Sequence, residues 1–164
     1  MRKPFALALI LPALALAFTA CGSGAKLPTP AVCLTTPGMW MTALAEAPDQ
    51  VLIEDAAPIS DCLPSDQAAA QQEAVGRTAV EVATRLSTFV QENGRNGDLE
   101  SPAEAALMAG YLVGAVERGA ADSEGIHDTL ASRVEAAATN GLDGAGPKLE
   151  RLYRKGYEAG LESG

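Results

Sequence analysis

Apolar residues recur at three- and four-residue steps through the second half of the chain, the spacing that places them on one face of an α-helix. Val75, Val82 and Leu86 belong to one such series, and further series follow it. The sequence therefore predicts an all-α protein. We expect a bundle of about four helices, at residues of about 65–93, 102–120, 123–139 and 147–161.

Local signals mark where these helices begin. Ser65 or Asp66 is suited to cap the first helix. Residues 101–104 read Ser-Pro-Ala-Glu, a capping box with Pro at the first helical position of the second helix. Asp122 or Ser123 starts the third helix, and a proline opens the fourth.

The same spacing predicts which side chains point inward or outward. We expect Phe89 on the buried face of the first helix, Ile126 on that of the third and Leu161 on that of the fourth. Three pairs with the acid four residues before the base are expected on exposed faces. They are Glu73 with Arg77, Glu81 with Arg85, and Glu150 with Arg154.

The second helix is apolar on all sides from Ala105 to Val116, which predicts that it lies at the centre of the bundle. This run is too short to span a bilayer. Ala106, Gly110 and Gly114 recur every four residues in it, so another helix backbone is able to approach closely. In membranes such spacing drives dimerisation, whereas in an Ala-rich core it allows tight packing within one chain.

An irregular arm precedes the bundle. Pro37 is suited to start a short helix that ends near Leu44, and residues 51–53 are a candidate for a brief extended piece. Prolines at three positions prevent longer elements. They are Pro48, Pro58 and Pro64.

The first twenty residues have the layout of an export signal. Arg2 and Lys3 precede an apolar run over residues 5–18, and small residues follow it. The run is shorter than the roughly 20 residues that a membrane-spanning helix needs.

Residues 18–23 read Phe-Thr-Ala-Cys-Gly-Ser and resemble the lipobox of bacterial lipoproteins, with Phe where Leu is usual. The resemblance implies a signal peptide at 1–20 and a diacylglycerol on Cys21. It implies a protein of the cell envelope, outside the cytoplasm and lipid-anchored to a membrane. Residues 21–32 would then be the attachment site and flexible tether, and 33–164 a single helical domain. The alternative is an ordinary secreted protein cut after Ala17, with Cys21 as a spare thiol.

Lipidation of Cys21 would leave Cys33 and Cys62, an even pair in a compartment where disulfides persist. We therefore expect a disulfide that clamps the arm to the start of the first long helix. Two free buried thiols are the alternative. The spacing of the pair fits no zinc site, and we expect no metal.

The chain is acidic, with a formal net charge of −9. Removal of the signal takes away Arg2 and Lys3, which leaves 10 of the 12 Lys and Arg residues against 21 Asp and Glu. Such a surface repels nucleic acid and anionic lipid headgroups, so we expect no nucleic-acid partner.

The sequence contains no recognised catalytic or cofactor motif. His127 is the only histidine, and its neighbours in sequence predict a residue on a helix surface. The loop around Asn93, Gly97 and Glu100 has oxygen ligands, but its spacing departs from a calcium-binding EF-hand because Ala103 stands where a bidentate Glu is needed. We therefore expect no catalytic residues and no cofactor.

Met39, Trp40 and Met41 are candidates for contact with a partner, because a Trp between two polarizable thioethers suits an adaptable surface. Alternatively, Trp40 fills the open end of the bundle. The sequence favours a noncatalytic protein-binding or structural module whose partner is another envelope protein. The alternative is a small-ligand binder or hydrolase with a site between helices.

Overall fold

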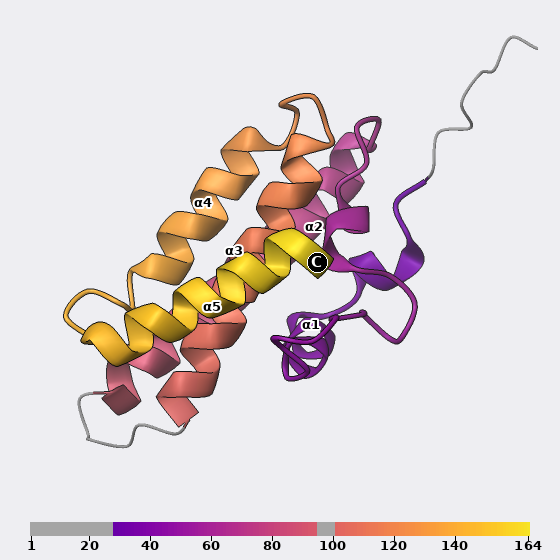
Figure 1. Ribbon diagram of the computed structural model, residues 1–164. Helices are drawn as coiled ribbons and strands as arrows, with labels where there is room; N and C mark the ends of the chain where they lie inside the picture. Colours follow the sequence, from indigo (N-terminus) through magenta and orange to yellow (C-terminus); the bar gives the residue numbers. More distant parts are fainter. Residues whose placement is uncertain (1–27, 95–100) are drawn as a thin grey trace, which may run out of the picture.

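Helices make up most of the described chain, residues 28–94 and 101–164 of the computed structural model (Figure 1). In chain order they are η1 (Ala31–Leu34), α1 (Pro37–Leu44), η2 (Ile59–Cys62), α2 (Ala69–Gly94), α3 (Ser101–Ala121), α4 (Asp128–Thr139) and α5 (Pro147–Ser163). Within these ranges the only β-type pairing is an isolated bridge between Ile53 and Ala57. The predicted all-α bundle of four long helices behind an irregular arm is confirmed.

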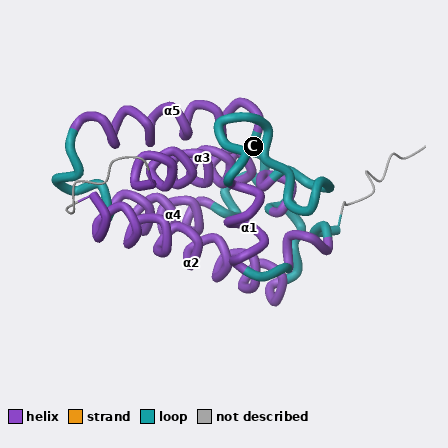
Figure 2. The backbone as a smooth tube through the Cα atoms, turned by 90° about the horizontal axis from the view of Figure 1, so that it is seen from below, coloured by secondary structure: helices purple, strands orange, loops and turns teal. Residues whose placement is uncertain are grey.

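Helix α3 lies at the centre, with α5 on one side and α2 and α4 on the other (Figure 2). Its position follows from its composition, because residues 109–116 are buried without interruption. A helix with no polar face is most stable when neighbouring elements bury it on all sides. Among the described residues, neither α3 nor any other helix combines the length and apolar character needed to cross a bilayer.

Gly110 and Gly114 of α3 lie directly against the backbone of α5. A Cβ atom built on Gly110 would stand 1.9 Å from the carbonyl oxygen of Tyr153. One built on Gly114 would stand 2.2 Å from that of Tyr157. Real Cβ atoms do not approach other atoms so closely, so only glycine fits at either position. The predicted close approach is confirmed, and it occurs within one chain.

The contact is reciprocal, because α5 presents its own pair of glycines to α3. The Cβ position of Gly156 lies 1.9 Å from the carbonyl oxygen of Leu107, and that of Gly160 lies 2.2 Å from the carbonyl oxygen of Tyr111. Residue numbers rise together along the two helices, so α3 and α5 are parallel. Helix α4 runs the other way between them in sequence (Figure 1).

Cys33 of η1 and Cys62 of η2 form a disulfide with a Cα–Cα distance of 5.4 Å, and both residues are buried. The predicted pairing is confirmed. It closes a loop with a sequence separation of 29. In the chain-entropy account such a loop stabilises the fold by about 3.6 kcal/mol. The arm therefore folds back on itself before α2 begins.

Hydrogen bonds attach the arm to the bundle. The Tyr111 hydroxyl, buried on α3, accepts a hydrogen bond from the Val51 backbone N–H at 3.1 Å. The same hydroxyl lies 3.2 Å from Ser163 Oγ on α5. The Ser60 hydroxyl donates to the carbonyl of Gly164. One central tyrosine thus ties the arm and α5 to α3.

Helix α2 begins at Ala69, four residues later than the expected cap at Ser65. The reason is the side chain of Gln67, whose Nε2 donates to Cys62 O and to Thr29 Oγ1, both at 2.9 Å. These bonds hold the segment before α2 beside the disulfide, with a turn at residues 65–66. The capping signal was thus overridden by contacts distant in sequence.

Helix α4 begins at Asp128, and the expected start at Asp122 or Ser123 is wrong. Glu124 and Gly125 adopt φ angles of 55° and 88°. These left-handed conformations are incompatible with a continuous right-handed helix. Residues 122–127 form turns instead.

Three residues expected on buried faces are exposed. Phe89 is 43% exposed, Ile126 51% and Leu161 40%. Val90, next to Phe89, takes the buried position in α2. Ile126 lies outside α4, so the helical periodicity that placed it inward does not apply to it.

Candidate interaction groove between α2 and α4

An open groove of about 620 Å³ runs between α2 and α4. Its apolar lining includes Val80 on α2, Leu130 on α4 and Ile126 just before α4. Gly76 lies buried among them. A Cβ added there would be 3.3 Å from Leu130 Cδ1, so the absence of a side chain leaves room for Leu130. The groove thus has an apolar floor in which Val80 is partly exposed and Ile126 is exposed, while Gly76 and Leu130 are buried beneath them.

The groove is as long as a short helix. On α2 its lining extends from Ala69 to Glu81. Twelve helical residues span about 18 Å, or a little over three turns. Leu130 and Arg133 extend the opposite wall along α4.

Charges of both signs line the rim. On α2, Glu73 and Arg77 form an ion pair at 3.8 Å with both side chains largely exposed. On α4, Arg133 is exposed and lines the same groove. Exposed pairs of this kind contribute little to stability, so these charges remain available to a partner.

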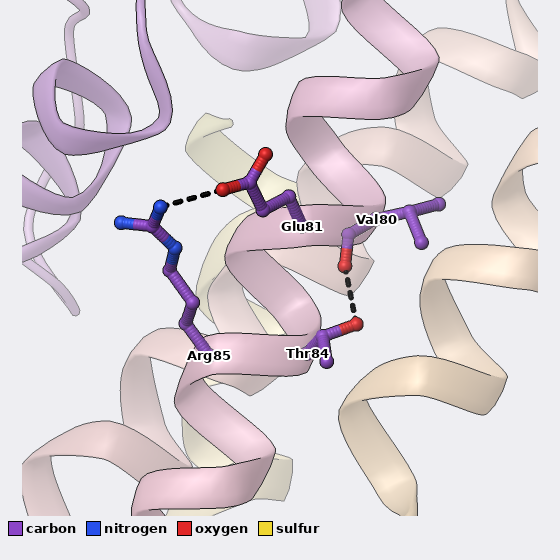
Figure 3. A network of polar contacts seen from close by, with 4 residues as sticks. All are labelled: Val80, Glu81, Thr84 and Arg85. Carbon is purple, nitrogen blue, oxygen red and sulfur yellow. Dashed lines mark hydrogen bonds and ion pairs between the residues drawn. The ribbon is translucent and has the colours of Figure 1, made fainter.

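A second pair lies about two turns further along α2, where Arg85 donates to Glu81 at 2.5 Å. Figure 3 shows the Arg85 side chain folded back along the helix to Glu81, while the Val80 side chain points away from this pair. The Thr84 hydroxyl donates to the Val80 carbonyl at 2.8 Å. Both predicted acid-first pairs of α2 are therefore formed.

Gln72 and His127 form a polar cluster at the groove. The Gln72 side chain lines the groove, and its Nε2 donates to His127 Nδ1 at 3.3 Å and to Ile126 O at 3.5 Å. His127 Nε2 lies 3.2 Å from the carbonyl of Pro64. Because a carbonyl only accepts, this geometry assigns the proton to Nε2 and leaves Nδ1 as the acceptor.

The expectation that His127 lies on a helix surface is wrong, because it is fully buried. Both ring nitrogens are occupied, and neither is hydrogen-bonded to a carboxylate in the described residues. Its backbone N–H donates to Ser123 Oγ at 3.3 Å. His127 therefore holds the start of α4 against α2 and the arm. This arrangement positions the groove and offers no general base.

Trp40 is also fully buried, so its side chain contributes nothing to an exposed contact surface. Of the three candidates for partner contact, Met39 is 38% exposed and Met41 is half-buried. Leu34 on η1 is 42% exposed. The arm thus presents single apolar residues, while its Trp belongs to the core.

Two tyrosines of α5 and two glutamates form a separate cluster. The Tyr157 hydroxyl donates to Glu117 of α3, and this hydrogen bond, with burial, raises the pKa of Tyr157 to about 12. Burial first, and then the charges of Glu135 and Glu117, raises the pKa of Tyr153 above its ordinary value. Both phenols stay protonated at neutral pH. They are hydrogen-bonding groups here and not proton acceptors.

The described ranges hold no group of three or more His, Cys, Asp or Glu side chains arranged to bind a metal ion. The loop considered for calcium and the lipidation site at Cys21 lie outside the described residues, apart from Asn93 at the end of α2.

The groove itself was not predicted from the sequence. The one available signal is Gly76, because a glycine in a helix interior costs about 1 kcal/mol relative to alanine and needs a reason. That reason is the Leu130 side chain, which belongs to a helix 54 residues later. The spacing of apolar residues in one sequence does not show which residue of a distant helix packs against Gly76.

Comparison of the chain with protein families, curated proteins and solved structures finds no match.

Proposed function

We propose that this protein is a lipid-anchored, noncatalytic module of the cell envelope that binds an amphipathic helix of another envelope protein in the α2–α4 groove. The observation that carries the proposal is the apolar floor of that groove, with Ile126 51% exposed at its edge. An exposed large apolar residue beside an open concave surface is typical of a binding site.

A helix is the occupant that matches this shape. Helix-in-groove recognition uses apolar side chains spaced at three and four residues, which enter a groove of comparable length. The rim carries Glu73 and Arg77 on one wall and Arg133 on the other. A partner helix with acidic and basic flanks would pair with these charges, which favours one orientation over its reverse.

Anchoring is supported by the N-terminal sequence. A lipid on Cys21 would hold the groove near a membrane surface and raise its effective concentration for partners there. The stretch from Cys21 to Pro28 reaches about 25 Å when extended, so the domain would keep access to membrane-bound neighbours.

Replacing Cys21 with Ala is expected to release the protein from the membrane, because the proposed acyl attachment site is removed. Cell fractionation should move the protein from the membrane pellet to the soluble envelope fraction, while mass spectrometry of the wild type shows an acylated N-terminal cysteine. The Cys33→Ala, Cys62→Ala double variant is the control that keeps the anchor. An unmodified mature N-terminus in the wild type would contradict the anchoring proposal.

Replacing Ile126 with Ser is expected to weaken partner binding about tenfold, because half of a large apolar side chain no longer leaves water on binding. The partner segment is first identified with a photocrosslinking amino acid at Thr129, which is exposed and lines the groove. The same group at Thr88 on α2, exposed but outside the groove, is the reference. Affinity for a peptide of that segment is then measured by calorimetry.

Phe89→Ser is the matched control, because Phe89 is a large apolar residue of similar exposure that does not line the groove. Its affinity should equal that of the wild type. Equal crosslinking from Thr129 and Thr88, or a crosslinked segment without an apolar helical stripe, would contradict the groove as the site. Turnover of a small molecule abolished by substitutions in the groove would favour the ligand-binding alternative.

A further inference from the structure

Helix α5 carries a concentration of positive charge in an acidic protein. Four of the ten Lys and Arg residues that follow the signal fall between positions 148 and 155. They are Lys148, Arg151, Arg154 and Lys155, and all four are exposed. We call these four residues the α5 basic face.

The orientation of this face is fixed by packing on the opposite side of the helix. Gly156 and Gly160 of α5 lie against the backbone of α3. At 100° per residue, the four cations occupy an arc of about 120° on the side of α5 away from those glycines. They therefore point together into solvent.

The four cations have no ion-pair partner in residues 28–94 and 101–164, whereas Arg77 and Arg85 on α2 are both paired. The pair expected between Glu150 and Arg154 is not formed. The charge of the α5 basic face is thus available to an external anion.

The N-terminal half of α5, which carries the α5 basic face, lies at the end of the bundle remote from the point where the described chain begins (Figures 1 and 2). Nearer the arm, the outer side of α5 carries Glu158 and Glu162, both exposed. The sign of the charge therefore reverses along the helix. The centre of the four cations lies about 12 Å along the axis from the midpoint of Glu158 and Glu162, which exceeds the screening length of about 8 Å at physiological salt. Glu158 itself is one turn from Arg154.

We propose that the α5 basic face binds a flexible phosphodiester polymer of the cell envelope on the side of the domain away from the anchoring membrane. The direction relative to the membrane rests on the proposed lipid anchor; the binding itself does not. The overall negative charge of the chain does not prevent it, because the four cations outnumber the two exposed acids of α5 within one turn of them, Glu150 and Glu158. Acids more than a screening length away act weakly on a bound polymer.

Two features favour a polymer over other anionic partners. The outward side of α5 between 148 and 155 contains charged residues and no large exposed apolar residue, whereas protein interfaces have an apolar core. A membrane leaflet would meet the Pro28 end first, where Glu158 and Glu162 repel it. A polymer needs only a row of cations, because release of its counterions supplies the affinity.

The test uses the mature chain with Cys21→Ala and fluorescently labelled poly(glycerol phosphate), with anisotropy measured between 50 and 300 mM salt. If all four cations contact phosphates, the logarithm of affinity should fall with the logarithm of salt with a slope of about −3. The pair Arg151→Gln, Lys155→Gln should reduce the slope by about 1.4. At 0.1 M salt this pair should bind about 25-fold more weakly.

The pair Arg77→Gln, Arg85→Gln is the matched control, because it changes the net charge equally on another helix. Its affinity for the polymer should stay within about twofold of that of the parent protein. Circular dichroism should show that both double variants are folded. No binding at 50 mM salt, or equal losses in the two pairs, would overturn the proposal. Tighter binding to phosphatidylglycerol vesicles than to the polymer would overturn it in favour of a membrane-facing surface.

The outcome is distinguishable from that of the groove experiments. Ile126→Ser should leave polymer binding unchanged, because Ile126 lies beside α2 and α4 and not on α5. Loss of polymer binding in that variant would mean that the polymer uses the groove, which would overturn the assignment to α5.

Discussion

Replacing Gly110 with Ala is expected to lower the free energy of unfolding by about 3 kcal/mol or more. The new Cβ would stand 1.9 Å from the carbonyl oxygen of Tyr153, so α3 and α5 must move apart along their contact. The gain of about 1 kcal/mol that alanine brings to a helix interior acts in the opposite direction and is smaller. Denaturant unfolding measures the difference, and the melting temperature should fall by roughly 10 °C.

Gly76→Ala is the control for this substitution, because it makes the same chemical change in another helix interior. Its Cβ would meet only the flexible end of Leu130 at 3.3 Å. Stability should be unchanged or raised by up to about 1 kcal/mol. A Gly110→Ala protein as stable as the wild type would show that the two helices are not in close contact in solution.

Replacing Trp40 with Ala is expected to lower the free energy of unfolding by about 3 to 5 kcal/mol, because the largest side chain of the core is removed and leaves a cavity. Trp40→Phe should cost much less. The indole Nε1 has no hydrogen-bond partner among the described residues. Replacement by phenylalanine therefore removes a buried donor without breaking a hydrogen bond. Denaturant unfolding of the three proteins provides the comparison.

Partner binding separates this structural role from a contact role for Trp40. Trp40→Phe should retain wild-type affinity for the peptide captured by the groove. A Trp40→Ala protein of unchanged stability that no longer binds a partner would instead restore the Met39 to Met41 segment as the contact surface.

The long helices were predictable from sequence because their signals are local. Apolar spacing, the capping box at residues 101–104 and Pro147 all act within a few residues of the structure that they determine. The close contact at Gly110 and Gly114 was also predictable as an approach of some helix. Its partner α5 was not, because the matching glycines lie more than 40 residues away.

Burial of His127 was missed for the same physical reason. Its ring is held by Gln72 and by the carbonyl of Pro64, 55 and 63 residues earlier. Helix α4 starts at Asp128 and not at Ser123 because Glu124 adopts a left-handed backbone conformation. That conformation is rare for residues other than glycine, so the sequence does not predict it. The groove depends on the burial of His127 and on the late start of α4, because these two features determine where α4 begins relative to α2.

The disulfide was predicted from the count of cysteines and the expected compartment, without any geometric knowledge. The position of Trp40 was not, because the same three residues suit a surface or a core. What decided it was the arm, which is clamped by Cys33 and Cys62 and folds over the bundle.

The glycine contact between α3 and α5 also determines how the two helices are aligned. The Cα–H bond that a Cβ would replace at these glycines is directed at a carbonyl oxygen of the other helix. A contact of this kind is a weak C–H···O hydrogen bond, worth about 0.5 to 1 kcal/mol. Two such bonds run in each direction, from Gly110 and Gly114 and from Gly156 and Gly160. If α5 slid by one helical turn along α3, only one glycine of each helix would still face a glycine-lined contact. The other glycine would face a larger side chain. The helices therefore have a single favourable register. A shift out of that register would break the C–H···O hydrogen bonds and at the same time bring side chains into steric clash with the facing backbone.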